Sequence, residues 1–213
     1  MPDTKILTAI APLTVQEGDD ITCNVIYPVC VIVEGGKFTT EAQSVLGQLI
    51  VRGGEVKLGG VVDNVVIYDG MLDVDTQAEI SHITIYGGSV SVDGFVKHID
   101  VAIVGSTVTG AYDDKPKPTA YLTIEYQAIV DALHTSNEVG DAYINIKGGR
   151  LKQIWKGHSN GYMVIDKDVY TDEIVVTAGD ITVYGNRPVT IHPGVTVMWA
   201  KDEVSNGKTK TNR

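Results

Sequence analysis

Glycine recurs through the first half of this chain at nearly constant intervals, and the same apolar pattern surrounds each copy. The recurring glycines are Gly18, Gly36, Gly54, Gly70, Gly88 and Gly105. Aliphatic residues stand five and three positions before the first five of them, as Leu13 and Val15 do before Gly18. Later copies carry a second aliphatic pair after the glycine. Each unit is therefore a short alternating strand, a glycine corner and a second alternating strand.

A unit this short cannot bury its apolar side alone, so the copies have to stack on one another. The pattern predicts an all-β fold, a single-stranded parallel β-helix (β-solenoid) with coils of 16–18 residues. Equivalent aliphatic residues should form ladders, with Ile67 beside Val51 and Ile85 at one strand spacing of about 4.8 Å. The alternation changes phase across each glycine, which predicts a corner or a bulge there.

The repeat pattern breaks after residue 110. Residues 111–118 are rich in proline and charge and predict a loop. After this loop, Tyr126, Ile129, Val130 and Leu133 follow the i, i+3, i+4, i+7 spacing of an amphipathic helix. We therefore expect one inserted α-helix at about 125–135, which either packs on the flank of the solenoid or docks a partner.

The repeat resumes after the insertion. We expect four segments: solenoid coils over 1–110, the loop and helix insertion over 111–143, further coils and a cap over 144–200, and a polar tail over 201–213. Trp199 is the residue expected to cover the open end of the stack.

The charge balance limits the classes of partner. The 213 residues carry a formal net charge of −10, and the pI is about 4.8, which opposes a nucleic-acid-binding surface. The sequence contains no run of about 18 apolar residues, so we expect no membrane insertion. Residues 1–13 lack a long apolar core, so we expect no secretory signal there. Cys23 and Cys30 either form a bridge or remain as two buried thiols.

Paired carboxylates are the strongest catalytic candidates. Glu41, Asp75 and Asp93 each lie five positions after a glycine of the repeat. Asp75 and Asp93 should therefore be neighbours on adjacent coils, where they could share a proton, hold Ca²⁺ or act as a glycosidase pair. The simpler reading is that they end strands at a solvated corner.

Other catalytic and metal patterns are missing from the sequence. His82 and His98 are separated by nearly one coil and could stack, but no metal-binding spacing accompanies them. No phosphate-binding loop and no nucleophile elbow occurs. We therefore expect a protein that is not an enzyme, with no catalytic residue, no cofactor and no metal.

Aromatic residues mark the candidate interaction surface. The segment 155–162 combines Trp155 and Tyr162 with the hydrogen-bonding side chains of His158 and Asn160, a mixture that suits a sugar ring or a protein contact. Packing of the two rings under an irregular loop is the alternative. Tyr68 and Tyr86, one coil apart, should form an outward aromatic ladder or serve only as surface strand formers.

The Gly-Gly corners between valine-rich strands, at residues 50–56 and 85–92, resemble the repeats of bacterial autotransporter adhesin passengers. They are also similar to the short-coil β-helices of phage tail spikes and other virion appendages. The resemblance is one of pattern and covers about half of the chain, so it implies a fold far more than a function.

A six-residue spacing competes with this interpretation. The residues on that spacing are Ile50, Val56, Val62, Val74, Ile80 and Val92, and they resemble the left-handed hexapeptide helices of acyltransferases. Tyr68 and Tyr86 occupy two places where that motif needs a small aliphatic residue, and the coil length drifts. We therefore favour a right-handed solenoid.

The resemblance to virion appendages leads to a functional expectation. We expect a non-enzymatic structural protein of a phage virion: a capsid decoration, a fibre or a tail-spike component. Its partners would be other virion proteins or further copies of itself, with a homotrimer implied by analogy; a cell-surface glycan is a further possible partner. The alternatives are a bacterial cell-surface adhesin module and a polysaccharide-degrading β-helix enzyme.

Overall fold

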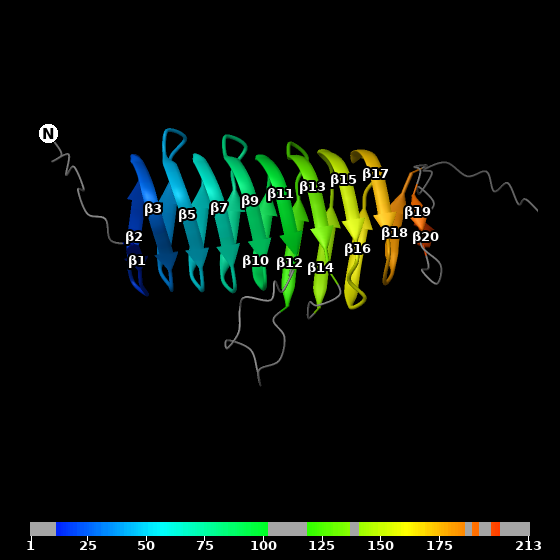
Figure 1. Ribbon diagram of the computed structural model, residues 1–213, viewed down its shortest axis with the longest axis horizontal. Coiled ribbons are helices and arrows are strands. Elements are labelled where there is room, and N and C mark those ends of the chain that lie inside the picture. The colour runs from blue at the N-terminus through cyan, green and yellow to red at the C-terminus, as the bar shows by residue number, and fades with distance from the viewer. Residues whose placement is uncertain (1–11, 102–118, 137–140, 186–188, 192–196, 201–213) are drawn as a thin grey trace, which may run out of the picture.

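The computed structural model of the protein describes residues 12–101, 119–136, 141–185, 189–191 and 197–200. Over these residues the fold is all-β, with two ten-stranded parallel sheets and no helix. Successive strands alternate between the sheets, and the coils stack along the long axis from β1 to β20 (Figure 1). The predicted β-solenoid is therefore confirmed.

We call the sheet of odd-numbered strands sheet A and the sheet of even-numbered strands sheet B. Sheet A contains β1 (Leu13–Val15), β3 (Ile26–Val33), β5 (Val45–Val51), β7 (Val61–Ile67), β9 (Glu79–Ile85), β11 (Phe95–Val101), β13 (Ile129–Thr135), β15 (Arg150–Lys156), β17 (Tyr170–Val176) and β19 (Thr190–Ile191). Sheet B contains β2 (Asp20–Cys23), β4 (Lys37–Thr40), β6 (Glu55–Leu58), β8 (Met71–Val74), β10 (Gly88–Val92), β12 (Ala120–Ile124), β14 (Ala142–Ile146), β16 (Gly161–Ile165), β18 (Ile181–Tyr184) and β20 (Val197–Ala200).

The core consists of aliphatic ladders that run along the stack. Val51 pairs with Ile67 and Ile67 pairs with Ile85, as predicted, and all three side chains are fully buried. Each such residue stabilises the fold by about 1.5–3 kcal/mol relative to an exposed side chain. Of the residues on the six-residue spacing, Ile50 departs from the core, because it lies half-buried between the fully buried Leu49 and Val51.

Strands of sheet A bury their side chains at a spacing that simple alternation does not produce. In β7 the buried positions are Val62, Val65 and Ile67, a step of three followed by a step of two. The pairing of β7 with β9 accordingly skips one residue on each strand between Val62 and Asn64. The same spacing recurs in the strands of sheet A from β5 to β15. Each of these strands therefore contains an irregularity, a departure from simple alternation, at the same place.

This irregularity explains why the predicted α-helix at about 125–135 is wrong. The segment begins as a turn and continues as β13. Val130 and Leu133 face the core, whereas Tyr126 and Ile129 are exposed. The three-residue step from Val130 to Leu133 belongs to the strand pattern of sheet A, yet it equals the spacing of one helical turn.

Two kinds of corner alternate where sheet B leads into sheet A. Four-residue turns follow β4, β8, β12 and β16, and shorter corners that contain glycine follow β6, β10 and β14. The turn after β8 is closed by a hydrogen bond from Ala78 N to Asp75 O of 2.9 Å. The longer turns project from one edge of the molecule (Figure 1).

Each short corner fits against the preceding long turn. A Cβ on Gly94 would collide with Asp75 O and would lie 2.8 Å from Ala78 O. The alternation of long turns and short corners accounts for the drift in coil length. Val65 pairs with Ile83 across a longer coil, and Ile83 pairs with Ile99 across a shorter one. The true repeat is therefore a pair of coils.

The predictions for the insertion, the tail and the cysteines have different outcomes. Residues 111–118, the tail at 201–213 and the side chain of Trp199 lie outside the described residues, whereas 120–124 and 129–135, expected in the insertion, form β12 and β13. Cys23 and Cys30 are free thiols and are half-buried, and burial raises the pKa of Cys30.

Candidate functional site

The outer face of sheet B carries two parallel rows of side chains, because in-register strands place equivalent residues side by side. The first row contains Lys37, Glu55, Met71, Ser89, Tyr121, Tyr143 and Tyr162. The second row contains Thr39, Lys57, Asp73, Ser91, Thr123 and Asn145. Both rows follow the long axis, so this face can contact an elongated partner along several coils.

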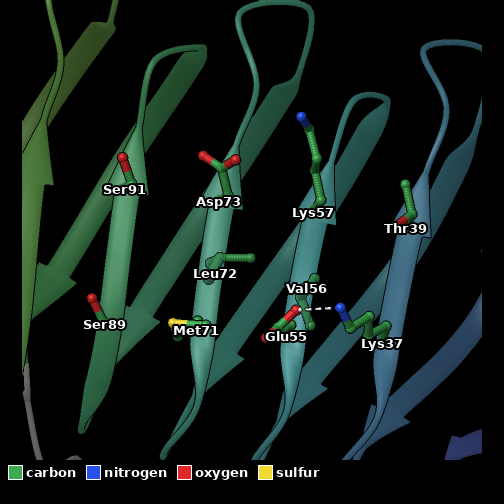
Figure 2. Close-up of a pocket in the computed structure, with 10 residues that line it drawn as sticks. All are labelled: Lys37, Thr39, Glu55, Val56, Lys57, Met71, Leu72, Asp73, Ser89 and Ser91. Carbon is green, nitrogen blue, oxygen red and sulfur yellow. Dashed lines mark ion pairs between the residues drawn. The ribbon is translucent and has the colours of Figure 1, made fainter. Parts of the chain in front are cut away.

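One part of this face is hollowed. Figure 2 shows the hollow over β4, β6, β8 and β10, with Met71 and Asp73 beside Ser89 and Ser91. Its volume is about 390 Å³. Lys37 Nζ lies 3.1 Å from Glu55 Oε2, and this ion pair spans two strands of the hollow.

Three tyrosines continue the first row beyond the hollow. We call Tyr121, Tyr143 and Tyr162 the tyrosine row. The rings of Tyr121 and Tyr143 are stacked, with centroids 5.3 Å apart and planes at 18°. Tyr162 lies across Tyr143 at 65°, with centroids 5.1 Å apart. Such aromatic pairs are worth about 0.5–1.5 kcal/mol beyond their buried area, and they present a line of phenol groups on the surface.

The segment 155–162, predicted as one interaction surface, is divided between three environments. Trp155 lies exposed on the outer face of sheet A, and Tyr162 lies exposed on sheet B. Asn160 is exposed on the connection between them, whereas His158 is buried, with 1% of its surface accessible. These four residues therefore do not form a single contact surface.

Tyr68 and Tyr86 form the predicted aromatic ladder. They directly follow β7 and β9, and their rings are stacked with centroids 5.0 Å apart and planes at 10°. Burial raises the pKa of Tyr86, with smaller contributions from Tyr68 and Asp100. The equivalent positions on the two preceding coils hold an ion pair, Arg52 Nη1 with Glu34 Oε1 at 3.3 Å.

A histidine and aspartate cluster occupies the outer face of sheet A. His82 and His98 are neighbours, as their spacing predicted, with ring centroids 6.1 Å apart, but their planes are tilted by 50° and are not stacked. His82 Nε2 lies 2.6 Å from Asp100 Oδ2, and His134 Nδ1 lies 3.7 Å from Asp100 Oδ1. The ring of His134 also meets the edge of Trp155. Among the described residues, no group of three or more such side chains could hold a metal ion.

A buried polar cluster inside the solenoid was missed by the sequence reasoning. Lys156 is fully buried, and its Nζ donates hydrogen bonds to the backbone oxygens of His158 at 2.6 Å and Ala178 at 2.8 Å. His158 Nδ1 lies 2.8 Å from Thr135 Oγ1. Lys156 pairs in register with Thr135 and with Val176, so counting inward positions along the coils would have identified it.

Burial sets the protonation of this cluster. It lowers the pKa of Lys156 to about 8. It also lowers the pKa of His158 to about 4, with a further contribution from the ammonium group of Lys156. His158 is therefore neutral at pH 7, and its neutral ring can share one hydrogen bond with the hydroxyl of Thr135.

Each of the two candidate carboxylates accepts a hydrogen bond at a corner. Asp75 Oδ1 accepts a hydrogen bond from Thr76 Oγ1 at 3.0 Å, and Asp93 Oδ1 accepts one from Gln127 N at 3.0 Å. The bond from Thr76 is the main cause that lowers the pKa of Asp75, and Lys57 adds to it. A glycosidase acid needs a raised pKa, so these contacts favour the strand-ending interpretation of Asp75.

Comparison with known proteins adds no family to this description: no family model, no curated protein and no solved structure matches the chain. None of the described residues belongs to a helix that could span a membrane.

Proposed function

We propose that this protein is a non-enzymatic β-helical scaffold or attachment rod that serves as a structural component of a phage virion, as a capsid decoration, a fibre or a tail-spike part. The observation that carries the proposal is the continuous pairing of ten strands in each of two sheets around one aliphatic core. A stack of this kind holds its length and leaves its outer faces free to carry contacts.

The physics of stacked coils supports a mechanical role. Each coil contacts mainly its two neighbours, so the stability of the stack is a sum of coil and interface terms. Outer residues can then vary without loss of the core, which suits a surface that must match a partner. The formal net charge of −10 also opposes unspecific association of the rods.

The proposal implies two kinds of partner, which are other virion proteins and further copies of this chain. It is tested by mass spectrometry of virus particles purified from the source of the sequence, with the copy number of this chain per particle. We expect a stoichiometric component; a high copy number indicates a capsid decoration, and a low one indicates a tail part. Absence of the chain from the particles would contradict the proposal.

The tyrosine row, with Tyr121 and Tyr162 exposed, favours a second candidate, a bacterial cell-surface adhesin module. Tyrosine offers a large amphipathic contact area at a low cost in conformational entropy. In that case the chain would be recovered from the bacterial surface and not from particles.

A further inference from the structure

We propose that the stretch of sheet B from Met71 through Ser89 to Tyr121, which begins in the hollow of Figure 2 and extends one strand beyond it, binds one sugar ring of a neutral cell-surface polysaccharide. We call it the serine notch. This inference deepens the proposed function, on which it rests, because it names a partner for the attachment rod and the place where that partner binds.

Tyr121 supplies an open aromatic wall. Its ring stacks on Tyr143 with a separation of 5.3 Å, close to the strand spacing of about 4.8 Å, so the ring planes face along the stack. The second face of Tyr121 is therefore turned toward β10, where its in-register neighbour is Ser89. A serine side chain is too short to cover a phenol ring, and Tyr121 is 51% exposed.

The C–H groups of a sugar ring can pack against this open face, because an aromatic face carries partial negative charge. On the opposite side of the notch, Met71 is 52% exposed and presents a flexible apolar side chain. Methionine adapts its shape to a partner more easily than branched residues do. The two walls thus offer apolar contacts to both faces of a sugar ring.

The floor of the serine notch offers hydrogen bonds suited to hydroxyl groups. Ser89 and Ser91 each carry a hydroxyl that both donates and accepts, and they lie two positions apart along β10, on the same face (Figure 2). The strands on either side place Asp73 and Thr123 in register with Ser91. Sugar hydroxyls also donate and accept hydrogen bonds, so the serine hydroxyls can pair with them in either direction.

Charge favours a neutral polymer over an anionic one. The two lysines on this part of sheet B are engaged in ion pairs, Lys37 with Glu55 at 3.1 Å and Lys57 with Asp75 at 3.4 Å. The chain as a whole carries a formal net charge of −10, which repels phosphate or sulfate polymers. The row continues through Tyr143 and Tyr162, so further sugar units can follow the rod.

The test is affinity electrophoresis of the full chain in native gels that contain dextran, laminarin, galactomannan or a purified neutral bacterial O-polysaccharide, one in each gel. We expect at least one polymer to retard the protein. Tyr121→Ala should weaken this retardation about tenfold or more, the size of effect expected at a central contact residue. Ser89→Tyr should do the same, because a ring there fills the notch and is favourable in a strand.

Tyr170→Ala is the matched control, since Tyr170 is 77% exposed on the other sheet and should bind like the unaltered chain. Circular dichroism checks that each variant is folded. The inference is overturned if none of the polymers retards the protein, if both notch variants bind normally, or if the control loses binding equally. The presence of the chain in virus particles is measured in a separate experiment. The sugar-binding proposal and the proposed function can therefore fail independently of one another.

Discussion

Lys156 occupies a core position at which the neighbouring coils carry Thr135 and Val176. A buried ammonium group is costly unless hydrogen bonds compensate it, and here two backbone oxygens accept from it. One of them belongs to His158, so a charged lysine and a neutral histidine are held together inside the stack. Protonation of His158 would place two positive charges in this buried site.

This arrangement predicts a loss of stability in acid. The pKa of His158 is about 4 in the folded protein against an ordinary value of 6.5, so the unfolded chain binds the proton first as the pH falls. The free energy of unfolding should decrease by about 3 kcal/mol between pH 6.5 and pH 4 through this residue alone. The measurement is urea unfolding at a series of pH values across this range.

The variant His158→Gln removes the titrating group and should flatten the acid dependence. The control is His98→Gln, which removes an exposed histidine from the outer face of sheet A. If His158→Gln and the unaltered protein lose stability equally on acidification, the buried histidine is not the cause.

At the scale of the element, the alternating corners determine how coils fit together. Gly94 of a short corner lies against Asp75 O and Ala78 O of the preceding long turn, and both are backbone atoms that cannot rotate away. Gly94→Ala should therefore destabilise the protein by about 2–3 kcal/mol, the upper part of the usual cost of forcing a methyl group into a packed site. Chemical unfolding followed by circular dichroism measures it.

Gly18→Ala provides the comparison. Gly18 has φ of 90°, but a Cβ there would meet nothing within 4 Å, so only the backbone strain of about 1 kcal/mol applies. A Gly94→Ala variant as stable as Gly18→Ala would show that the short corner does not depend on close contact with the long turn.

The coils could be predicted from the sequence because glycine and the aliphatic pairs repeat together, as around Gly54 and Gly88. The strand β13 could not, because its irregularity reproduces helical spacing at Val130 and Leu133. The tyrosine row was missed because connections of unequal length separate its three members, which therefore follow no constant interval along the chain. The neighbouring strands β10 and β12 are joined through residues 102–118, so the sequence does not show that Ser89 faces Tyr121.

At the scale of the whole molecule, a pair of coils can be removed so that every remaining short corner still packs against a long turn. Deletion of residues 60–93 removes one coil of each length and joins Gly59 to Gly94. The short corner so formed again follows the long turn at 41–44 and precedes the one at 125–128. Stability in a stack depends on matched neighbours, so this shortened protein should fold with the same β-sheet spectrum.

Deletion of residues 61–78 removes only a single coil, yet it should be the more damaging change. It joins Gly60 to Glu79 with the strand register intact, but it eliminates the long turn between two short corners. Gly94 then loses the backbone oxygens against which it packs. Thermal unfolding by circular dichroism should give a lower midpoint for this variant than for the 60–93 deletion, although it retains more coils. The reverse order would mean that the number of coils, and not the alternation of corners, limits the stability of the rod.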